Sequence, residues 1–279
     1  DRNSEAAIEA RAKASLKSRQ RLVYGLRIGI LIATLGIWEL GAKTGFIDPF
    51  FYASPSGIAD QIWTWMTEGT SQGSLWEQIL VTMEETLLGF IIGSAAGIFA
   101  GISLGRNKLL ADVFSIYIKV ANSIPRVVLG SIFIISLGLG MPSKVALAVV
   151  MVFFIVFANA FQGVREADRA MIANAQILGA SPFQITRAVV IPSAMSWILA
   201  SLHVSFGFAL VGAVVGEFLG AKKGLGLLIS TAQGSFNANG VFAAMVILAV
   251  LALAMEYLIT AVENRLVKWR PPAFNEQVT

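Results

Sequence analysis

Residues 81–104 read VTMEETLLGFIIGSAAGIFAGISL, and this run decides the fold class. An α-helix needs about 20 mainly apolar residues to cross a bilayer, and the run is long enough. Glycine recurs in and just after it at every fourth position, at Gly89, Gly93, Gly97, Gly101 and Gly105. On a helix this spacing forms a smooth ridge, about 24 Å long at 1.5 Å per residue, that another helix can approach closely in lipid. Two readings stay open: packing within the subunit, or a neighbouring helix that slides on the ridge during gating.

Apolar runs of similar character continue along the whole chain. They occupy residues 22–41, 113–139, 145–161, 190–215 and 241–261. Of the 279 residues, 56% are hydrophobic and 14% are charged, and the mean hydropathy is +0.72. In a soluble domain about 45–50% of the residues are apolar and about 25% are charged. Pro125 interrupts the third run and Pro192 opens the fifth. We predict an all-α, polytopic membrane protein with about six transmembrane helices in a domain over residues 22–264.

The positive residues predict the orientation. If the N-terminus is inside, fourteen lysines and arginines fall in inner segments and four in outer ones. The inner set is Arg2, Arg11, Lys13, Lys17, Arg19, Arg21, Arg106, Lys108, Arg165, Arg169, Arg187, Arg265, Lys268 and Arg270. The outer set is Lys43, Lys144, Lys222 and Lys223. Because cytoplasmic segments carry the excess of positive charge, we predict that the N-terminal segment 1–21 and the C-terminal tail 265–279 are both cytoplasmic.

The composition argues against several classes of function. The chain has no cysteine and one histidine, which leaves no disulfide framework and no His/Cys zinc site. It has no Gly-x-x-x-x-Gly-Lys-[Ser/Thr] phosphate-binding loop, so we expect no ATPase activity in this chain, which is not an enzyme by itself. The pI is near 9.5, but the basic residues flank the spans, which indicates topology rather than nucleic-acid binding. The polar opening segment is not typical of a secretory signal.

A short amphipathic helix is predicted between the first two spans. Ser56 is placed to cap it, and it carries Ile58, Ile62, Trp63 and Trp65. Because tryptophan is frequent in the headgroup zone of a bilayer, we expect this helix to lie near the outer surface of the membrane.

Between the fourth and fifth spans lies a segment with helix signals of its own, EADRAMIANAQILGASPFQITRAVVIP, residues 166–192. A first helix would end at Gly179, since glycine is favoured just after a helix C-terminus. A second helix would begin with Ser181 as its N-cap, Pro182 at its first position and Gln184 at its third, which is a capping box. The second helix would extend to Pro192, where the fifth span begins.

This connection is too long to be a simple turn. Helices in a bundle are commonly joined by about 2–8 residues, whereas this loop covers residues 166–190. Its apolar side chains need cover, and they are Ala170, Ile177, Phe183 and Ile185. They either pack on the spans of the same chain or dock on a partner protein.

One arginine falls near the middle of a predicted span. Arg126 follows a proline, and Asn122 and Ser123 precede it by about one turn. An ionisable group at membrane depth is costly unless it faces water or a partner. We expect Asn122, Ser123 and Arg126 to line a translocation path and to meet an anion. The alternatives are a structural ion pair or a shallower position for Arg126.

Acidic residues lie near the outer ends of the spans, namely Glu39, Glu84, Glu85 and Glu217. We also expect Glu217 to line the translocation path. The alternative for all four acids is that they lie at the membrane interface or form structural pairs. His203, near the middle of the fifth span, is expected to be a buried packing residue. No metal site is predicted.

The end of the loop carries a recognisable spacing. Gly179 is followed, after nine residues, by Val189-Val190-Ile191-Pro192. This resembles the cytoplasmic signature of permeases of binding-protein-dependent ABC importers, which reads Glu-Ala-Ala, three residues, Gly, nine residues, Ile-x-Leu-Pro. The opening differs, because Ala173, Asn174 and Ala175 stand at the Glu-Ala-Ala positions and only the last alanine agrees.

Short motifs elsewhere are similar to the nitrate/sulfonate/taurine/bicarbonate subgroup of that family. They are Ile37-Trp38-Glu39-Leu40, Pro55-Ser56, Ser123-Ile124-Pro125-Arg126, Gly138-Leu139-Gly140, Ser143-Lys144, Gly216-Glu217-Phe218 and Gly224-Leu225-Gly226. The resemblance covers residues 36–270, and the order and spacing of the motifs make it specific.

The resemblance implies a type I ABC importer permease fold in the bacterial inner membrane. Two copies would form the pore, two cytoplasmic ATPase subunits holding ATP and Mg²⁺ would bind the loop, and an extracytoplasmic binding protein would deliver a small anionic solute. The chain itself would bind no cofactor. The residues expected to couple to the ATPase are Ala173, Asn174, Ala175, Gly179, Ala180, Ser181, Pro182, Phe183 and Pro192. The alternative is a secondary transporter or channel without an ATPase partner.

Overall fold

The computed structural model describes residues 2–167 and 169–266. In chain order the elements are α1 (Arg2–Lys43), α2 (Pro49–Tyr52), α3 (Pro55–Thr67), α4 (Leu75–Gly105), α5 (Lys108–Ser123), α6 (Arg126–Leu137), α7 (Met141–Arg165), α8 (Arg169–Ile177), α9 (Pro182–Ile185), the π-helical turn η1 (Thr186–Val190), α10 (Ile191–Leu219), α11 (Leu225–Gly234) and α12 (Ala238–Leu266). Within these ranges there is no strand, so the predicted all-α class is confirmed. The predicted C-terminal tail beyond residue 266 lies outside the described residues.

Five helical segments are long and apolar enough to cross a bilayer. They are Arg19–Lys43, Leu75–Gly105, Met141–Arg165, Pro182–Leu219 and Ala238–Ala261. A bent pair, Leu109–Ala121 and Arg126–Leu137, gives a sixth span if it is counted as one. The number of candidate spans therefore agrees with the prediction.

The third predicted span differs in shape from the expectation of one interrupted helix. Its two halves, α5 and α6, meet at 84°. Ile124 and Pro125 between them are both extended, with ψ of 126° and 105°. Proline has no N–H to donate and disfavours a helical conformation in the residue before it. These two residues therefore turn the chain and separate two helices, whereas an interruption within one span was expected.

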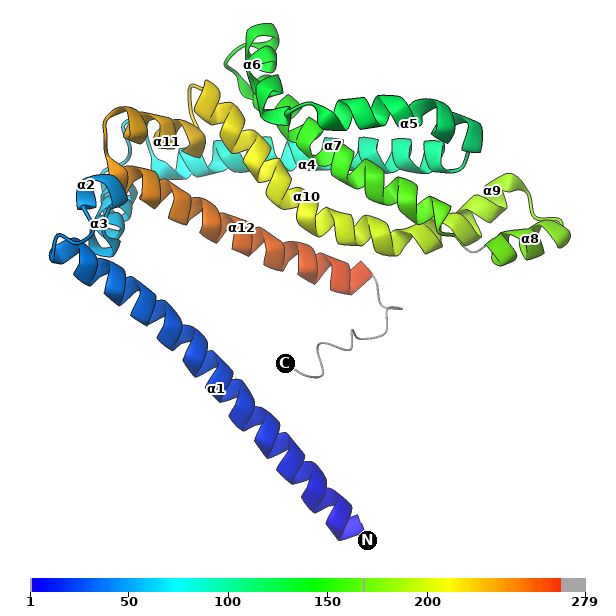
Figure 1. Ribbon diagram of the computed structural model, residues 1–279, viewed down its shortest axis with the longest axis horizontal. Helices are drawn as coiled ribbons and strands as arrows, with labels where there is room; N and C mark the ends of the chain where they lie inside the picture. Colours follow the sequence, from blue (N-terminus) through cyan, green and yellow to red (C-terminus); the bar gives the residue numbers. More distant parts are fainter. Residues whose placement is uncertain (1, 168, 267–279) are drawn as a thin grey trace.

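Three helices form the centre of the molecule. α4, α7 and α10 run side by side over much of their length (Figure 1). The glycine ridge of α4 faces α7: a Cβ added to Gly93 would lie 2.8 Å from the Val149 carbonyl oxygen, and one added to Gly101 would lie 2.8 Å from that of Phe157. The ridge therefore packs within the subunit, as the first of its two readings predicts.

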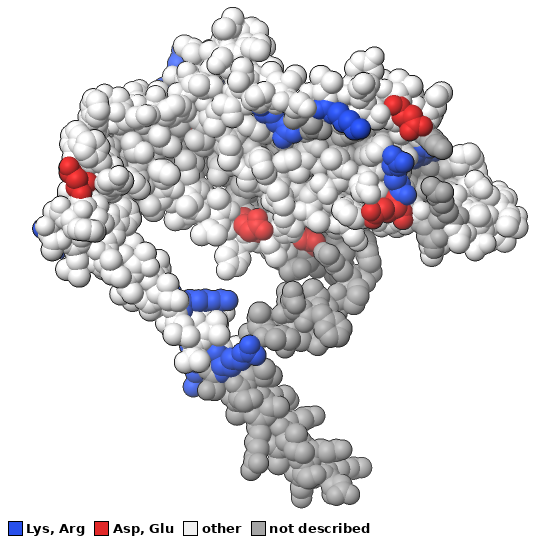
Figure 2. Space-filling view, viewed as in Figure 1, with Lys and Arg blue, Asp and Glu red and all other residues white. Residues whose placement is uncertain are grey.

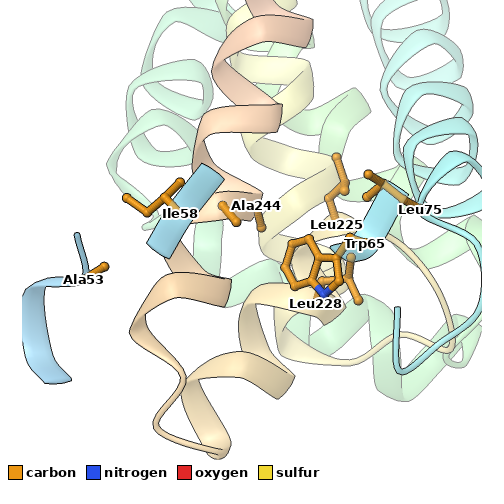
Figure 3. Packing of buried hydrophobic residues seen from close by; sticks show 8 residues of the cluster. Ala53, Ile58, Trp65, Leu75, Leu225, Leu228 and Ala244 are labelled. Carbon is orange, nitrogen blue, oxygen red and sulfur yellow. The ribbon is translucent and has the colours of Figure 1, made fainter. Parts of the chain in front are cut away.

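A second packing centre lies at one end of the molecule, which we call the α11 end. There α3, α11 and α12 meet, and Ile58, Trp65, Leu225 and Leu228 pack together among their buried side chains (Figure 3). At the opposite end, which we call the loop end, α8 and α9 connect α7 to α10 (Figure 1). The two ends are separated by the length of the central helices.

The amphipathic helix α3 begins earlier than predicted. Its N-cap is Ser54, whose Oγ accepts a hydrogen bond from the Gly57 N–H at 3.1 Å, with Pro55 at the first helical position. Ser56, the predicted cap, instead donates its hydroxyl to Glu39 Oε1 of α1 at 2.9 Å. Pro55 explains the difference, because its fixed φ and missing N–H suit the first position of a helix.

α1 is one unbroken helix that contains both the predicted N-terminal segment and the first span. It leaves the bundle at the α11 end (Figure 1), where Trp38 packs edge-on against Phe242 of α12 with 5.6 Å between ring centroids. Most of its apolar side chains between residues 22 and 40 are exposed within the chain. In a membrane, lipid or another subunit covers such a surface.

Candidate functional site

The loop end carries the predicted helix–turn–helix. After α8, Gly179 has a φ of +79°, a left-handed conformation that glycine adopts readily. Ser181 and Gln184 form the predicted capping box: the Gln184 N–H donates to Ser181 Oγ at 3.3 Å, and the Ser181 N–H donates to Gln184 Oε1 at 2.8 Å. The local signals that end one helix and begin the next are therefore confirmed.

This loop has an inner face that packs on the spans and a tip that does not. Ile185 on the inner face is buried in a cluster with Val164 of α7. The tip, by which we mean Ile177, Leu178 and Phe183, is 83%, 86% and 70% exposed. The inner face fits the reading of packing within the chain, while the tip leaves apolar side chains that this chain does not cover.

The residues expected to couple to the ATPase gather at this end. Most of them are exposed, namely Ala173, Asn174, Gly179, Ser181, Pro182, Phe183 and Pro192. Ala175 and Ala180 are half-buried and pack against the spans. All of them belong to the loop or to the start of the helix that follows it.

Pro192 lies in the first turn of α10, where the fifth span was predicted to begin, but no gap in the helix separates α10 from the loop helix before it. α9, η1 and α10 form one continuous helical segment of 38 residues, Pro182–Leu219, which we call the long helix. The Ile191 N–H donates to the carbonyl of Thr186, five residues back, so a π-helical turn accommodates a proline that cannot donate. The long helix joins the loop to the α11 end, and its axis bends between α9 and α10 (Figure 1).

Arg126 lies in the first turn of α6, at the bend after α5. Its guanidinium carbon is 5.2 Å from the centroid of the Phe154 ring on α7, a cation–π contact. Ser123 is exposed and donates its hydroxyl to the carbonyl of Lys119 at 2.9 Å. The side chain of Asn122 lies outside the described residues. Of the predicted path residues, Ser123 and Arg126 thus lie at one bend of the chain.

Glu217, the fourth predicted path residue, lies near the α11 end of the long helix and is fully buried. Its Oε1 accepts a hydrogen bond from the Thr82 hydroxyl of α4 at 2.7 Å. Its Oε2 accepts from the Gly226 N–H in the first turn of α11, also at 2.7 Å. These bonds give Glu217 partners away from the bend that carries Arg126, which favours the structural reading of this acid.

Two polar residues of α4 hold the neighbouring amides of α11. Thr82 Oγ1 accepts from the Leu225 N–H at 2.9 Å, and Gln78 Oε1 accepts from the Gly224 N–H at 2.8 Å. Together with Glu217 they bind three consecutive amides at the N-terminus of α11, where helical N–H groups have no partner inside the helix. We call Gln78, Thr82 and Glu217 the α11 anchor.

Two further charged groups are buried beside the anchor. Lys144 of α7 donates its ammonium to the carbonyls of Leu139 at 2.7 Å and Gly140 at 3.2 Å. The carboxyl group of Glu85 on α4 lies beside that of Glu217. Both residues are buried. The position of Glu85 beside another acid fits the reading of a structural pair, and Lys144 lies in the first turn of α7, bonded to the loop that precedes it.

His203 is not surrounded by apolar packing alone, as was expected. Its Nδ1 lies 3.1 Å from Glu256 Oε1, and its Nε2 contacts the Glu263 carboxylate, so the ring joins the long helix to two acids of α12. Among the residues that the structure describes, no group of His, Cys, Asp and Glu side chains is arranged to hold a metal ion.

Five to six candidate spans, with buried polar groups between them and a structured loop at one end, define a polytopic membrane protein. Residues 93–268 match the family described as the binding-protein-dependent transport system inner membrane component. Because the match covers more than half of the chain, the protein belongs to this family of ABC importer permease subunits, as the sequence motifs predict.

Similar proteins support the same assignment. The riboflavin transport system permease protein RibX of Chloroflexus aurantiacus is 29% identical over 93% of this chain and 96% of its own length. The taurine transport system permease protein TauC of Escherichia coli is 26% identical over 88% of this chain and 89% of its own. A solved structure of the MetNI methionine ABC transporter, in an inward-facing conformation, has a TM-score of 0.54 at 22% identity and covers 70% of this chain and 93% of that chain. This last likeness confirms the predicted permease fold.

Proposed function

We propose that two copies of this chain form the pore of an ABC importer in the bacterial inner membrane, with the loop end in the cytoplasm. Two ATPase subunits, which bind ATP and Mg²⁺, dock on the loop end, and an extracytoplasmic binding protein delivers a small anionic solute at the α11 end. The observation that carries this proposal is the exposed apolar tip, Ile177, Leu178 and Phe183, on a loop of fixed geometry.

The tip suits a protein partner better than lipid. It lies beyond the apolar parts of α7 and the long helix, whose loop ends carry Arg165 and Arg187. Arginines at the ends of spans favour the cytoplasmic boundary of the membrane. An apolar surface held out into water marks an interaction site. A rigid loop also transmits the movement of a docked ATPase, which a flexible loop would absorb.

Gly179→Val is expected to leave the protein in the membrane but to weaken ATPase binding. No atom lies within 4 Å of the position that a Cβ would take, so the effect comes from the φ of +79°. A side chain in that conformation costs about 1–2 kcal/mol, which the loop relieves by changing the angle between α8 and α9. The measurement is pull-down of the ATPase, together with ATP turnover stimulated by the binding protein in reconstituted membranes. Wild-type values for both would mean that residues 166–190 only connect two spans.

An anionic solute is proposed from the position of Arg126. The residue is half-buried at the bend between α5 and α6, where its guanidinium group contacts an aromatic ring. Relatives named for taurine and for aliphatic sulfonates handle molecules that carry a sulfonate anion. A guanidinium group binds such an anion through charge-assisted hydrogen bonds.

Arg126→Ala is expected to lower solute uptake about tenfold or more, because a hydrogen bond to a charged group contributes about 1.5–3 kcal/mol. Assembly with the ATPase should be retained. The measurement is uptake of the solute found by ligand screening of the binding protein, at matched expression, with Arg126→Lys as the variant that keeps the charge. Normal uptake by Arg126→Ala would exclude a role in the path, and loss of the protein from the membrane would indicate a structural role instead.

The orientation is tested by labelling single cysteines, since the chain has none of its own. A cysteine placed after residue 270 should react with a membrane-impermeant maleimide only after the cells are permeabilised. Phe46→Cys, at a position 90% exposed near the α11 end, should react in intact cells. Labelling of the C-terminal cysteine in intact cells would contradict a cytoplasmic loop and, with it, docking of the ATPase there.

A further inference from the structure

We propose that Glu217 is a positioning residue through which the long helix carries α11 with it when the ATPase moves the loop. The inference rests on the proposed function and adds to it the point at which motion reaches the opposite end of the protein. It is carried by two observations: the long helix has no break between Pro182 and Leu219, and Glu217 near its far end is bonded to α11.

The first observation concerns the path of the motion. A helix resists stretching along its axis, because each turn is joined to the next by backbone hydrogen bonds, and the π-helical turn η1 keeps this connection between α9 and α10. The long helix begins with the capped turn of the loop and ends beside the N-terminus of α11. A displacement at Pro182 therefore reaches Glu217 without crossing a loop.

The second observation concerns how firmly α11 is attached. The Glu217 carboxylate bonds both the Thr82 hydroxyl and the Gly226 N–H, and none of these groups is open to solvent. Gly224 and Gly226 fit closely around it: a Cβ added to Gly226 would lie 2.3 Å from the Val214 carbonyl oxygen of the long helix. Because the junction is closely packed and hydrogen-bonded, we expect α11 to move together with the long helix.

The junction also includes an exposed ion pair that serves as a matched control. Lys223, just before α11, lies with its Nζ 2.5 Å from Glu77 Oε1 of α4, and both side chains are about half exposed. Exposed pairs of this kind contribute little, about 0–1 kcal/mol. If the buried anchor carries the motion, breaking this pair leaves the motion intact.

The test uses two spin-label sites in the cysteine-free chain assembled with its ATPase. Thr231→Cys reports on α11 and Val211→Cys reports on the long helix, and both positions are exposed. Pulsed electron resonance measures the distance between the two copies of each label, without nucleotide and with Mg²⁺, ATP and vanadate. In the otherwise unmodified complex, we expect both distances to shift on addition of nucleotide.

Thr82→Val, which keeps the shape of the residue and removes its hydroxyl, and Glu217→Gln are the test variants. The shift at Val211→Cys should be retained in both, and the shift at Thr231→Cys should be lost. Lys223→Gln should retain both shifts. A full shift at Thr231→Cys in both test variants would overturn the proposal, as would loss of both shifts, since the anchor would then support the general packing only. Absence of any shift in the unmodified complex would instead overturn the proposed coupling to the ATPase, and this inference with it.

Discussion

Leu178→Asp is expected to reduce binding of the ATPase about a hundredfold. Leu178 is 86% exposed at the tip of the loop, and burial of a leucine side chain in an interface stabilises a complex by about 1.5–3 kcal/mol. A carboxylate buried there without a partner adds a desolvation cost of similar size. The low end of this sum, about 3 kcal/mol, already corresponds to about two powers of ten in affinity. The measurement is the equilibrium affinity of purified ATPase for the permease in detergent or nanodiscs.

Gln176→Asp is the matched control for the added charge. Gln176 is exposed on α8, two residues before Leu178, and is polar already. If charge alone disturbed the loop, both variants would lose binding to a similar extent. Equal affinities for Leu178→Asp and the unmodified chain would contradict docking at the tip.

Gly101→Val is expected to cause a large loss of stability. A Cβ at Gly101 would lie 2.7 Å from the Cβ of Ala160 and 2.8 Å from the carbonyl oxygen of Phe157, so α4 and α7 must separate. Overpacking typically costs about 1–3 kcal/mol, and here a backbone atom rather than a flexible side chain is in the way, so we expect the upper end of that range or more. The measurement is thermal unfolding of the purified protein, followed by loss of the monodisperse peak in gel filtration.

Gly207→Val makes the same change in another membrane-spanning helix, α10. No atom lies within 4 Å of a Cβ built at Gly207, so this variant should unfold close to the unmodified protein. Equal losses from the two variants would mean that valine propensity, rather than the contact between α4 and α7, sets the effect. Unchanged stability in Gly101→Val would contradict the packed ridge.

Features set by local chemistry could be read from the sequence. The apolar runs gave the candidate spans because the length needed to cross a bilayer is fixed. The capping box of Ser181 and Gln184 and the left-handed Gly179 depend on residues a few positions apart, and the structure has both. The start of α3 was predicted less exactly, because two candidate N-caps, Ser54 and Ser56, stand on either side of Pro55.

Prolines produced opposite results in two spans. Pro125 follows an extended Ile124 and separates two helices, whereas Pro192 lies in a helix that continues through a π-helical turn. The missing N–H is common to both positions, so the sequence does not distinguish them. The backbone on the N-terminal side of the proline differs. Before Pro192, the Ile191 N–H bonds to a carbonyl five residues back instead of four, and the helix continues through a residue that cannot donate.

The α11 anchor could not be assembled from the sequence, because its two residues on α4 lie more than a hundred positions from Glu217 and from α11. Gln78 and Thr82 are polar residues four positions apart in an apolar helix, a pattern that indicates a polar stripe. The pattern does not say which segment meets the stripe. Glu217 was placed with the translocation path for the same reason, since only the fold shows that its oxygens are bonded to Thr82 and Gly226.

Charged side chains cover only a small part of the visible face of the protein (Figure 2). Basic and acidic side chains lie next to one another near the loop end, and broad uncharged areas separate them from the other charged residues (Figure 2). Such areas suit lipid or another copy of the chain, and the clusters near the loop end suit the cytoplasmic boundary in the proposed orientation.

The central claim is that the loop end is where the ATPase docks, and photo-crosslinking tests it most directly. The photoreactive residue p-benzoylphenylalanine is introduced in place of Phe183 at the loop tip or of Phe236 near the α11 end, which are 70% and 74% exposed. In a reconstituted complex that hydrolyses ATP, position 183 should form a covalent adduct with the ATPase subunit and position 236 should form none. An adduct with the ATPase from position 236, or none from position 183, would contradict the account.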